Sequence, residues 1–329
     1  MNTTANTEKK KKAVNASLIG NIAPYAGLVL VVIVFTILTK GALLSSVNLQ
    51  ALANSVIVTA LCTIGAVFVF GAGYFDMSMG GTLCLSAVLG GMVTVSTGSL
   101  ILGFVVILAV SIVLGLIKAL LATYVNVPFF IFTIILSSIF SALVLVIMGK
   151  ETTISLSNAV TPIREFSFTE ISIINVIVLV LFFVFCLIAF NYTPIGLNAK
   201  NIGGNKFAAK QSGISNVKTT FTVFLFGALG VALAAFLVML RTRTVMATMA
   251  GSVGNDVMVA LVLGGMPLSG GPKSKISAGI IGAITITVLN SGLTILGLTT
   301  GQIQICRGVV FIVVVLVSSL SYRGKLLPR

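Results

Sequence analysis

Repeated long runs of apolar residues are the feature that most constrains the fold of this chain. A helix needs about 20 apolar residues to cross a hydrocarbon core roughly 30 Å thick, and inside that core it satisfies its own backbone hydrogen bonds. The runs lie at roughly 22–39, 52–70, 79–95, 100–123, 129–148, 173–190, 217–239, 254–266, 275–297 and 302–320. Only 8% of the 329 residues are charged, against about 25% in a soluble domain. We therefore expect an all-α polytopic membrane protein with about ten transmembrane helices, some broken or short.

Two glycine-rich segments interrupt the apolar pattern beside the shortest runs. They are Gly71–Gly81 and Gly264–Gly271. Broken helices at membrane depth are tolerated only where they are buried in protein or line a cavity. We expect both breaks to border a pathway and to face the same side of the membrane.

The basic residues predict the orientation in the membrane. The chain has 20 Lys and Arg against 6 Asp and Glu, and because the basic residues lie between apolar runs rather than on one face, we do not expect nucleic-acid binding. A cytoplasmic N-terminus places most of them inside, as the positive-inside rule requires. The inside set is Lys9 to Lys12, Lys118, Lys200, Lys206, Lys210, Lys218, Lys273, Lys275, Arg323, Lys325 and Arg329.

This orientation divides the chain into three parts. We expect a cytoplasmic basic tail over 1–21, a transmembrane domain over 22–320 and a cytoplasmic tail over 321–329. The segment 149–172 is the one sizeable external segment and holds Glu151, Glu165 and Glu170. Both termini are then cytoplasmic.

The residues needed for catalysis are missing from the sequence. There is no histidine, which removes the commonest general base and metal ligand. The four cysteines, Cys62, Cys84, Cys186 and Cys306, fall inside apolar runs without close pairing, so we interpret them as small buried hydrophobic residues. No Gly-x-x-x-x-Gly-Lys-[Ser/Thr] phosphate loop occurs. We expect no catalytic residue, no metal site and no cofactor in this chain.

The longest internal loop, 192–216, contains a short basic helix between spans six and seven. Ala208, Ala209 and Gln211 favour helix, and Gly213 can end it. The helix is either an interfacial segment whose lysines meet anionic lipid or a docking helix for a cytoplasmic subunit.

Several segments carry a family resemblance, in order, across about residues 50 to 320. Thr193-Pro-Ile-Gly and Ile202-Gly-Gly-Asn-Lys-Phe-Ala-Ala-Lys-Gln-Ser-Gly-Ile214 resemble a cytoplasmic coupling region. Tyr74-Phe-Asp-Met-Ser-Met-Gly80 is similar to a Gly-Ile-Asp-Leu-Ser-Val-Gly signature, and Val127-Pro-Phe-Phe-Ile-Phe-Thr133 to Val-Pro-Pro-Phe-Ile-Val-Thr. Leu263-Gly-Gly-Met-Pro-Leu-Ser-Gly-Gly271 and Leu289-Asn-Ser-Gly-Leu293 complete the set. The chain resembles permease subunits of ribose-type sugar ATP-binding-cassette importers, which include ribose, galactose, xylose and autoinducer-2 permeases.

The resemblance implies partners and a location. It implies a second permease copy or homologue, a cytoplasmic ATP-binding subunit that binds ATP and Mg, an external solute-binding protein and a bacterial cytoplasmic (inner) membrane. Two departures, Tyr74-Phe75 for Gly-Ile and Phe129 for the second proline, add bulk near two motifs. The coupling residues implied are Gly203, Gly204, Asn205, Ala208, Ala209, Ser212 and Gly213.

Polar residues near the breaks are candidates for the pathway. Asp76 either caps the half-helix that begins near Ser78 or contacts a solute hydroxyl, because an unpaired carboxylate in hydrocarbon costs about 3 kcal/mol or more. Asp256 could cap the next short span in the same way. Asn290 and Ser291 either form hydrogen bonds between helices or line the pathway.

Two further pairs of residues have alternative roles. Phe129 and Phe130, after Pro128, are either ordinary packing or an apolar constriction of the pathway. Arg241 and Arg243 stand outside against the positive-inside trend. They either contact lipid headgroups or meet acidic groups of a docking binding protein.

The function hypothesis is import of a small neutral sugar-like solute by alternating access, driven by a partner ATPase. The small number of intramembrane charges favours a neutral solute over ion coupling. The alternatives are a nucleoside or autoinducer-2 permease of the same family, or a secondary transporter that works without ATP. A membrane enzyme would need histidine or clustered carboxylates.

Overall fold

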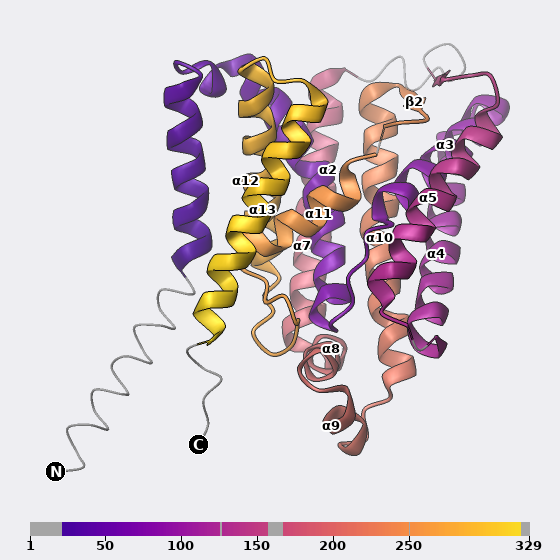
Figure 1. Cartoon of the computed structure of the whole chain (residues 1–329). Coiled ribbons are helices and arrows are strands. Elements are labelled where there is room, and N and C mark those ends of the chain that lie inside the picture. The colour runs from indigo at the N-terminus through magenta and orange to yellow at the C-terminus, as the bar shows by residue number, and fades with distance from the viewer. Residues whose placement is uncertain (1–21, 126, 157–166, 250, 324–329) are drawn as a thin grey trace.

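The structure is a computed structural model that describes residues 22–125, 127–156, 167–249 and 251–323, and these residues are almost entirely helical (Figure 1). Seven of the helices are long and apolar enough to cross a membrane. The predicted all-α polytopic fold is confirmed. The seven are α2 (Ser46–Gly71), α3 (Met79–Thr97), α4 (Leu100–Tyr124), α5 (Phe129–Met148), α7 (Phe168–Tyr192), α10 (Asn216–Thr242) and α12 (Ser277–Ile295).

Three further apolar helices complete the set of about ten predicted spans. They are the helix Ile22–Leu38, α11 (Val253–Leu263) and α13 (Thr300–Arg323). The predicted tail 1–21, Glu165 and the last residues 324–329 lie outside the described residues. The orientation lysines at positions 9–12 and 325, and Arg329, lie outside them as well.

Most of these helices run alternately up and down between two ends of the molecule, and α11 is a short oblique helix between them (Figure 1). The short helices α8 (Pro194–Gly204) and α9 (Lys206–Gln211) lie together at one end, which we call the α9 end. Strand β2 (Thr244–Met246) lies near the other, the β2 end. The helix Ile22–Leu38 starts at the α9 end, and α13 returns to it, so both described ends of the chain lie on one side.

The core of the bundle is formed by α2, α3, α10 and α12, each about 70% buried along its most apolar stretch. Helices α2 and α10 pack closely because Gly65 and Gly230 lie at their contact, and a Cβ on Gly65 would come within 2.7 Å of the carbonyl oxygen of Phe226. The rings of Phe68 and Phe226 stack at 4.1 Å beside this contact. Small residues that let backbones approach are typical of helix packing in membranes.

Serine side chains define where several helices begin. Ser45, Ser99 and Ser215 each accept a hydrogen bond from a backbone N–H in the first turn of α2, α4 and α10. At the start of α7, Ser167 and Glu170 form a capping box. Such caps satisfy N–H groups that have no partner within the helix.

A small sheet at the β2 end was not predicted. Strands β1 (Thr153–Ser155) and β2 pair antiparallel, with Ile154 opposite Val245. The backbone N–H of Leu156 donates to the carbonyl of Arg243 at 2.9 Å and extends the pairing. The sheet ties the predicted external segment 149–172 to the end of α10.

Candidate functional site

Three glycine-containing segments that are far apart in the sequence meet near the α9 end. The backbone N–H of Gly271 donates to the carbonyl oxygen of Gly71 at 2.9 Å, which confirms that the two breaks face the same side. A Cβ on Gly203 would overlap that same carbonyl oxygen and approach the nitrogen of Gly271 to 2.7 Å. Only glycine permits this backbone contact. We call this contact the glycine junction; it consists of residues 71–73, 203–204 and 270–271.

The predicted short helix of the segment 192–216 is α9, and a second helix that was not predicted, α8, precedes it. Thr193 accepts from the N–H of Ile195 at the start of α8. Asn205 then takes an extended backbone conformation, and its Oδ1 accepts from the N–H groups of Phe207 and Ala208, both at 3.0 Å, so that α9 starts anew. The N-cap preference of asparagine is the sequence signal for this second start.

The predicted coupling residues lie at several different places around α8 and α9. Gly203 and Gly204 belong to the glycine junction, and Ala209 is buried beneath α9. Asn205 is the cap. Exposed coupling residues form part of the outward surface of α9. This surface also contains an aromatic residue that was not predicted, Phe207, whose side chain is 82% exposed. The exposed coupling residues are Gly204, Asn205, Ala208, Ser212 and Gly213.

Helix α8 is fixed to the membrane domain through Phe190. A Cβ on Gly196 would overlap the carbonyl oxygen of Phe190, so α8 turns tightly against the end of α7. The Phe190 ring meets Phe68 of α2 edge-on, with centroids 5.0 Å apart. The Nζ of Lys200 lies 4.4 Å from the centroid of the same ring, and partial burial lowers the pKa of this lysine. The Phe190 ring therefore links α8 to α2.

Asp76 forms a buried ion pair at the first break. Its Oδ2 lies 2.7 Å from the Nζ of Lys118 on α4, and the two side chains are 1% and 2% exposed. The Oδ1 accepts from the backbone N–H of Ser78 at 2.8 Å and from its hydroxyl at 2.6 Å. Lys118 also donates to Thr82 at 3.2 Å. Every charge at this site is thus compensated, as burial in a membrane requires.

This ion pair corrects one prediction and completes another. Lys118 was assigned to the cytoplasmic set of basic residues, but it lies inside α4 and holds the break through Asp76. Asp76 does accept a hydrogen bond from the backbone N–H of Ser78 beside the start of α3. The cap position itself is Ser78, two residues later. The capping interpretation therefore misses the main partner of Asp76, which is Lys118. A lysine within an apolar run was the available signal.

The second acidic site is also an ion pair, so the proposed capping role of Asp256 was wrong. Its Oδ1 lies 2.7 Å from a guanidinium nitrogen of Arg307 on α13, and Ser252 donates to Oδ2 at 3.1 Å. The Nε of Arg307 donates to Oδ1 of Asn290 at 2.6 Å. The network joins α11, α12 and α13.

The geometry supports hydrogen bonding between helices for Asn290 and Ser291. Ser291 donates to Asn48 on α2 at 2.9 Å, and Asn290 binds Arg307.

The two phenylalanines after Pro128 have different surroundings. Phe129 is buried against Tyr74 and Phe224, with centroids 5.6 and 5.1 Å away, whereas Phe130 is exposed.

A small inner cavity lies between Asp76 and α11. Its volume is about 10 Å³, which is room for a single water molecule at most. The ring cluster of Tyr74 and Phe129 lies beside it, and the Tyr74 hydroxyl is 3.0 Å from Thr220 on α10. The structure is therefore closed to a solute at this depth. The lining residues are Ala66, Val69, Phe70, Tyr74, Asp76, Met79, Val257, Met258 and Leu261.

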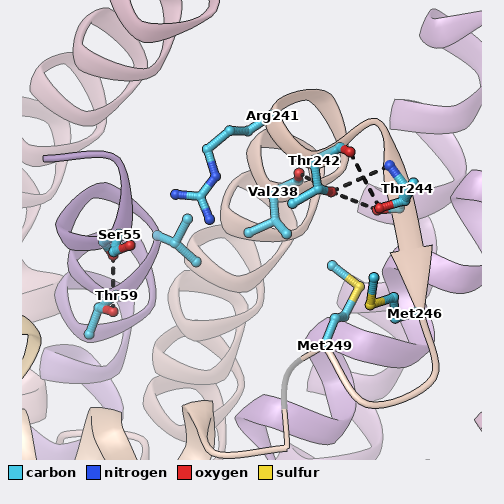
Figure 2. A pocket seen from close by; sticks show the side chains of 9 residues that line it. Ser55, Thr59, Val238, Arg241, Thr242, Thr244, Met246 and Met249 are labelled. Carbon is cyan, nitrogen blue, oxygen red and sulfur yellow. Dashed lines mark hydrogen bonds between the residues drawn. The ribbon is translucent and has the colours of Figure 1, made fainter. Parts of the chain in front are cut away.

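An outer pocket of about 250 Å³ lies near the β2 end. Figure 2 shows the Arg241 guanidinium pointing from α10 toward α2, where Ser55 and Thr59 lie. Arg243 instead ends α10 in a left-handed conformation, with φ 54°. The two arginines that were predicted as one docking pair therefore occupy different environments. The pocket is lined by Ser55, Val58, Thr59, Val238, Arg241, Thr242, Thr244, Met246 and Met249.

Comparisons with known proteins agree with this architecture. Residues 48–318 match the family described as branched-chain amino acid transport system / permease component. The ribose import permease protein RbsC of Bacillus subtilis (strain 168) is 30% identical over 297 residues, 90% of this chain and 91% of that protein. The galactose/methyl galactoside import permease protein MglC of Haemophilus influenzae is 28% identical over 227 residues, 66% of each chain. No solved structure matches the chain.

Proposed function

Because the chain belongs to the family of branched-chain amino acid transport system / permease components, we propose that it is the permease subunit of an ATP-binding-cassette importer for a neutral sugar. The curated relatives support the class of solute, since their names describe import of ribose and of galactose or methyl galactoside. The apolar helices support a multi-pass position in the membrane.

The arrangement of charges favours a sugar over an amino acid. Asp76 and Asp256 are each paired with a basic side chain, and Glu170 forms the capping box at the start of α7. An amino acid carries both an ammonium and a carboxylate group, and its ammonium would need an acidic partner in the pathway. The outer pocket contains Arg241 but no carboxylate. A neutral polyol requires no such partner.

The glycine junction is the observation that carries the coupling mechanism. A cytoplasmic ATP-binding subunit, which would bind ATP and Mg, docks on the outward surface of α9. Movement of α8 then reaches the end of α2 and both breaks directly, because backbone contacts backbone there. Packed elements of this kind shift as units rather than deform continuously. The segment Tyr74–Asp76 follows the junction at once, so the same movement opens the closed pathway.

The remaining partners follow from the two ends of the molecule. The α9 end is cytoplasmic, with the start of the helix Ile22–Leu38 and the end of α13 on that side, and an external solute-binding protein docks at the β2 end, where Arg243 lies. A second permease copy or a homologue packs against part of the exposed apolar surface, and lipid covers the rest.

Replacing Phe207 with alanine tests the docking surface. Phe207 is an exposed aromatic anchor of the kind that dominates protein interfaces, so we expect the variant to lose at least tenfold of its affinity for the ATP-binding subunit. Stimulation of the ATPase in proteoliposomes should fall accordingly. Tyr192→Ala is the matched control, because Tyr192 is an equally exposed ring, 80%, at the end of α7.

The two variants separate the possible results. Loss of affinity in Phe207→Ala, with Tyr192→Ala unchanged, supports docking on α9. Unchanged affinity and stimulation in Phe207→Ala would contradict it. Solute flux through the purified chain without any ATPase would overturn the importer assignment as a whole.

A further inference from the structure

The backbone of Tyr74 belongs to the end of α2. Gly73 takes a positive φ of 84°, and its N–H donates to the carbonyl oxygen of Phe70 at 2.9 Å. The N–H of Tyr74 donates to the carbonyl oxygen of Val69 at 3.1 Å. This pair of hydrogen bonds is a Schellman motif, which ends a helix and fixes the residues that follow it. Tyr74 must therefore move with the end of α2.

The side chain of Tyr74 is bound to α10 instead. Its hydroxyl lies 3.0 Å from Oγ1 of Thr220. A threonine hydroxyl has one hydrogen, and Thr220 donates it to the carbonyl oxygen of Asn216 at 2.8 Å. Tyr74 is therefore the donor to Thr220. The Tyr74 ring also contacts α10 one turn later, where the centroid of the buried Phe224 ring lies 5.6 Å away.

The hydrogen bonds continue from the start of α10 to α9. Asn216 is the first residue of α10, and its side-chain amide donates at 3.4 Å to the carbonyl oxygen of Lys206, the first residue of α9. Residues 212–215 alone separate the two helices. Within this link the N–H of Ile214 donates to the carbonyl oxygen of Ala209 at 3.0 Å. A continuous set of contacts thus joins Tyr74 to α9.

The start of α5 completes the surroundings of Tyr74. Phe129, the first residue of α5, meets the Tyr74 ring edge-on at 5.6 Å and the Phe224 ring at 5.1 Å. Tyr74 and Phe129 belong to the two departures that add bulk to the motifs this chain resembles. Because the two rings touch, the added bulk fills one place, where the first break meets the starts of α5 and α10.

We infer that Tyr74 is a positioning residue of the importer, which makes the first break move with α9 and the start of α10 as well as with α8. The inference rests on the proposed function for the docking of the ATP-binding subunit on α9. The glycine junction joins α8 to the break through the backbone of Gly71. Tyr74, three residues later, joins the break to α10 through its side chain. Both helices of the segment 192–216 therefore act on the end of α2.

The second contact has a mechanical consequence. A segment held at one point can turn about that point, whereas a segment held at two points has a defined orientation. With the glycine junction alone, a displacement of α8 would let the break rotate. With Tyr74 bound to Thr220 as well, the same displacement moves the segment Tyr74–Asp76 in one direction. Coupling of this kind travels through packed side chains and hydrogen bonds that are contiguous.

Variants that remove single hydroxyl groups test the inference. Tyr74→Phe and Thr220→Val each delete the hydrogen bond between these residues and keep the side-chain volume, whereas Thr220→Ser keeps the accepting oxygen. Tyr124→Phe is the matched control for tyrosine, because Tyr124 is exposed at the end of α4. Thr222→Val is the control for threonine, because the Thr222 hydroxyl donates to the carbonyl oxygen of Lys218 within α10.

The complete importer, with its ATP-binding subunit and loaded binding protein, is reconstituted in proteoliposomes, and uptake of ribose or galactose per ATP hydrolysed is measured. We expect Tyr74→Phe and Thr220→Val each to lower this ratio at least threefold. The double variant should be no lower than the lower single variant, because both changes remove the same bond. Thr220→Ser and both controls should keep the wild-type ratio. The sugar concentration for half-maximal uptake should stay unchanged, since Tyr74 acts on movement rather than on binding.

Three results would overturn the inference. The first is a wild-type ratio in either Tyr74→Phe or Thr220→Val. The second is a double variant in which the losses of the two single variants multiply, because independent effects would then explain them. The third is a raised half-saturating sugar concentration at an unchanged ratio, which would assign Tyr74 to solute binding.

Hydrogen exchange gives a readout that needs no sugar. Adding the ATP-binding subunit to the detergent-solubilised permease should slow amide exchange at residues 71–78. This protection should be at least threefold smaller in Tyr74→Phe, while protection of α9 stays equal to that of the wild type. Equal protection of residues 71–78 in the two proteins would overturn the inference.

The two readouts separate the inference from the proposed function. If the exchange pattern is as expected but the wild-type complex imports neither ribose nor galactose, the sugar assignment fails and the role of Tyr74 stands. If the wild-type complex imports sugar but Tyr74→Phe matches it in both measurements, the importer stands and the role of Tyr74 fails.

Discussion

The buried ion pair between Lys118 and Asp76 leads to the most quantitative prediction. Lys118→Met removes the ammonium group and leaves the Asp76 carboxylate buried next to α4. The carboxylate keeps its two hydrogen bonds from Ser78, at 2.8 and 2.6 Å, but loses the ammonium group of Lys118, which lies at 2.7 Å. The variant therefore tests how strongly the first break is held to α4.

The size of the effect follows from the burial of both side chains, 2% and 1% exposed. Removing one partner of such a pair costs about 3–5 kcal/mol, whereas replacing both with neutral residues is often close to neutral. The two hydrogen bonds from Ser78 remain, so we expect about 3 kcal/mol for Lys118→Met. Asp76→Asn keeps an oxygen that can accept from Ser78, and the double variant should lie within about 1 kcal/mol of the wild type.

The free energy of unfolding can be measured for this double-mutant cycle by titrating the detergent-solubilised protein with sodium dodecyl sulfate and following its helical circular dichroism. Lys210→Met is the matched control, because Lys210 is an exposed lysine on α9 and should change stability by less than about 0.5 kcal/mol. We expect a coupling energy of at least about 2 kcal/mol between positions 76 and 118, because the double variant should cost about 1 kcal/mol or less whereas Lys118→Met alone costs about 3 kcal/mol. A coupling energy below about 0.5 kcal/mol would refute the inference that the pair holds the break in place.

Three further changes test other parts of the structure. Gly203→Ala places a methyl group against the carbonyl oxygen of Gly71, so sugar uptake per ATP hydrolysed should fall at least tenfold, and an unchanged ratio would contradict a role of the glycine junction in coupling. Arg307→Met should cost less than Lys118→Met in the same detergent titration, because its ion pair is more exposed, and a larger loss would contradict this ranking. Asn205→Ala removes the cap of α9 at a cost of about 1 kcal/mol, and hydrogen exchange should accelerate in α9 while α8 stays protected.

The membrane helices could be predicted from the sequence because their signals are local. The run predicted at 129–148 is α5 as observed, and the run at 100–123 is one residue shorter than α4. Length and apolar content decide such helices, since hydrocarbon leaves the backbone few other structures. The end of α9 near Gly213 could also be predicted, because glycine readily takes the positive φ that often follows a helix. The φ of Gly213 is 81° in the structure.

The candidate site could be predicted only in part because its contacts join distant segments. Asp76 was recognised as a charge that needs compensation, but its partner Lys118 lies on another helix, and helix packing alone decides which basic residue reaches it. Gly203 was assigned to the docking surface, whereas its contact with Gly71 depends on how α8 turns against α7. Strands β1 and β2 are three residues long each, too short for an alternating pattern to show.

Helix α11 has a consequence for biogenesis. Its 11 residues rise about 16 Å, roughly half of a hydrocarbon core about 30 Å thick. The rest of the crossing is irregular backbone, which lipid cannot solvate. The segment from β2 to Gly271 therefore cannot leave the translocon as an independent unit. Arg307 can neutralise Asp256 only after α12 and α13 have been synthesised, so we expect the last three crossings, α11 to α13, to insert together.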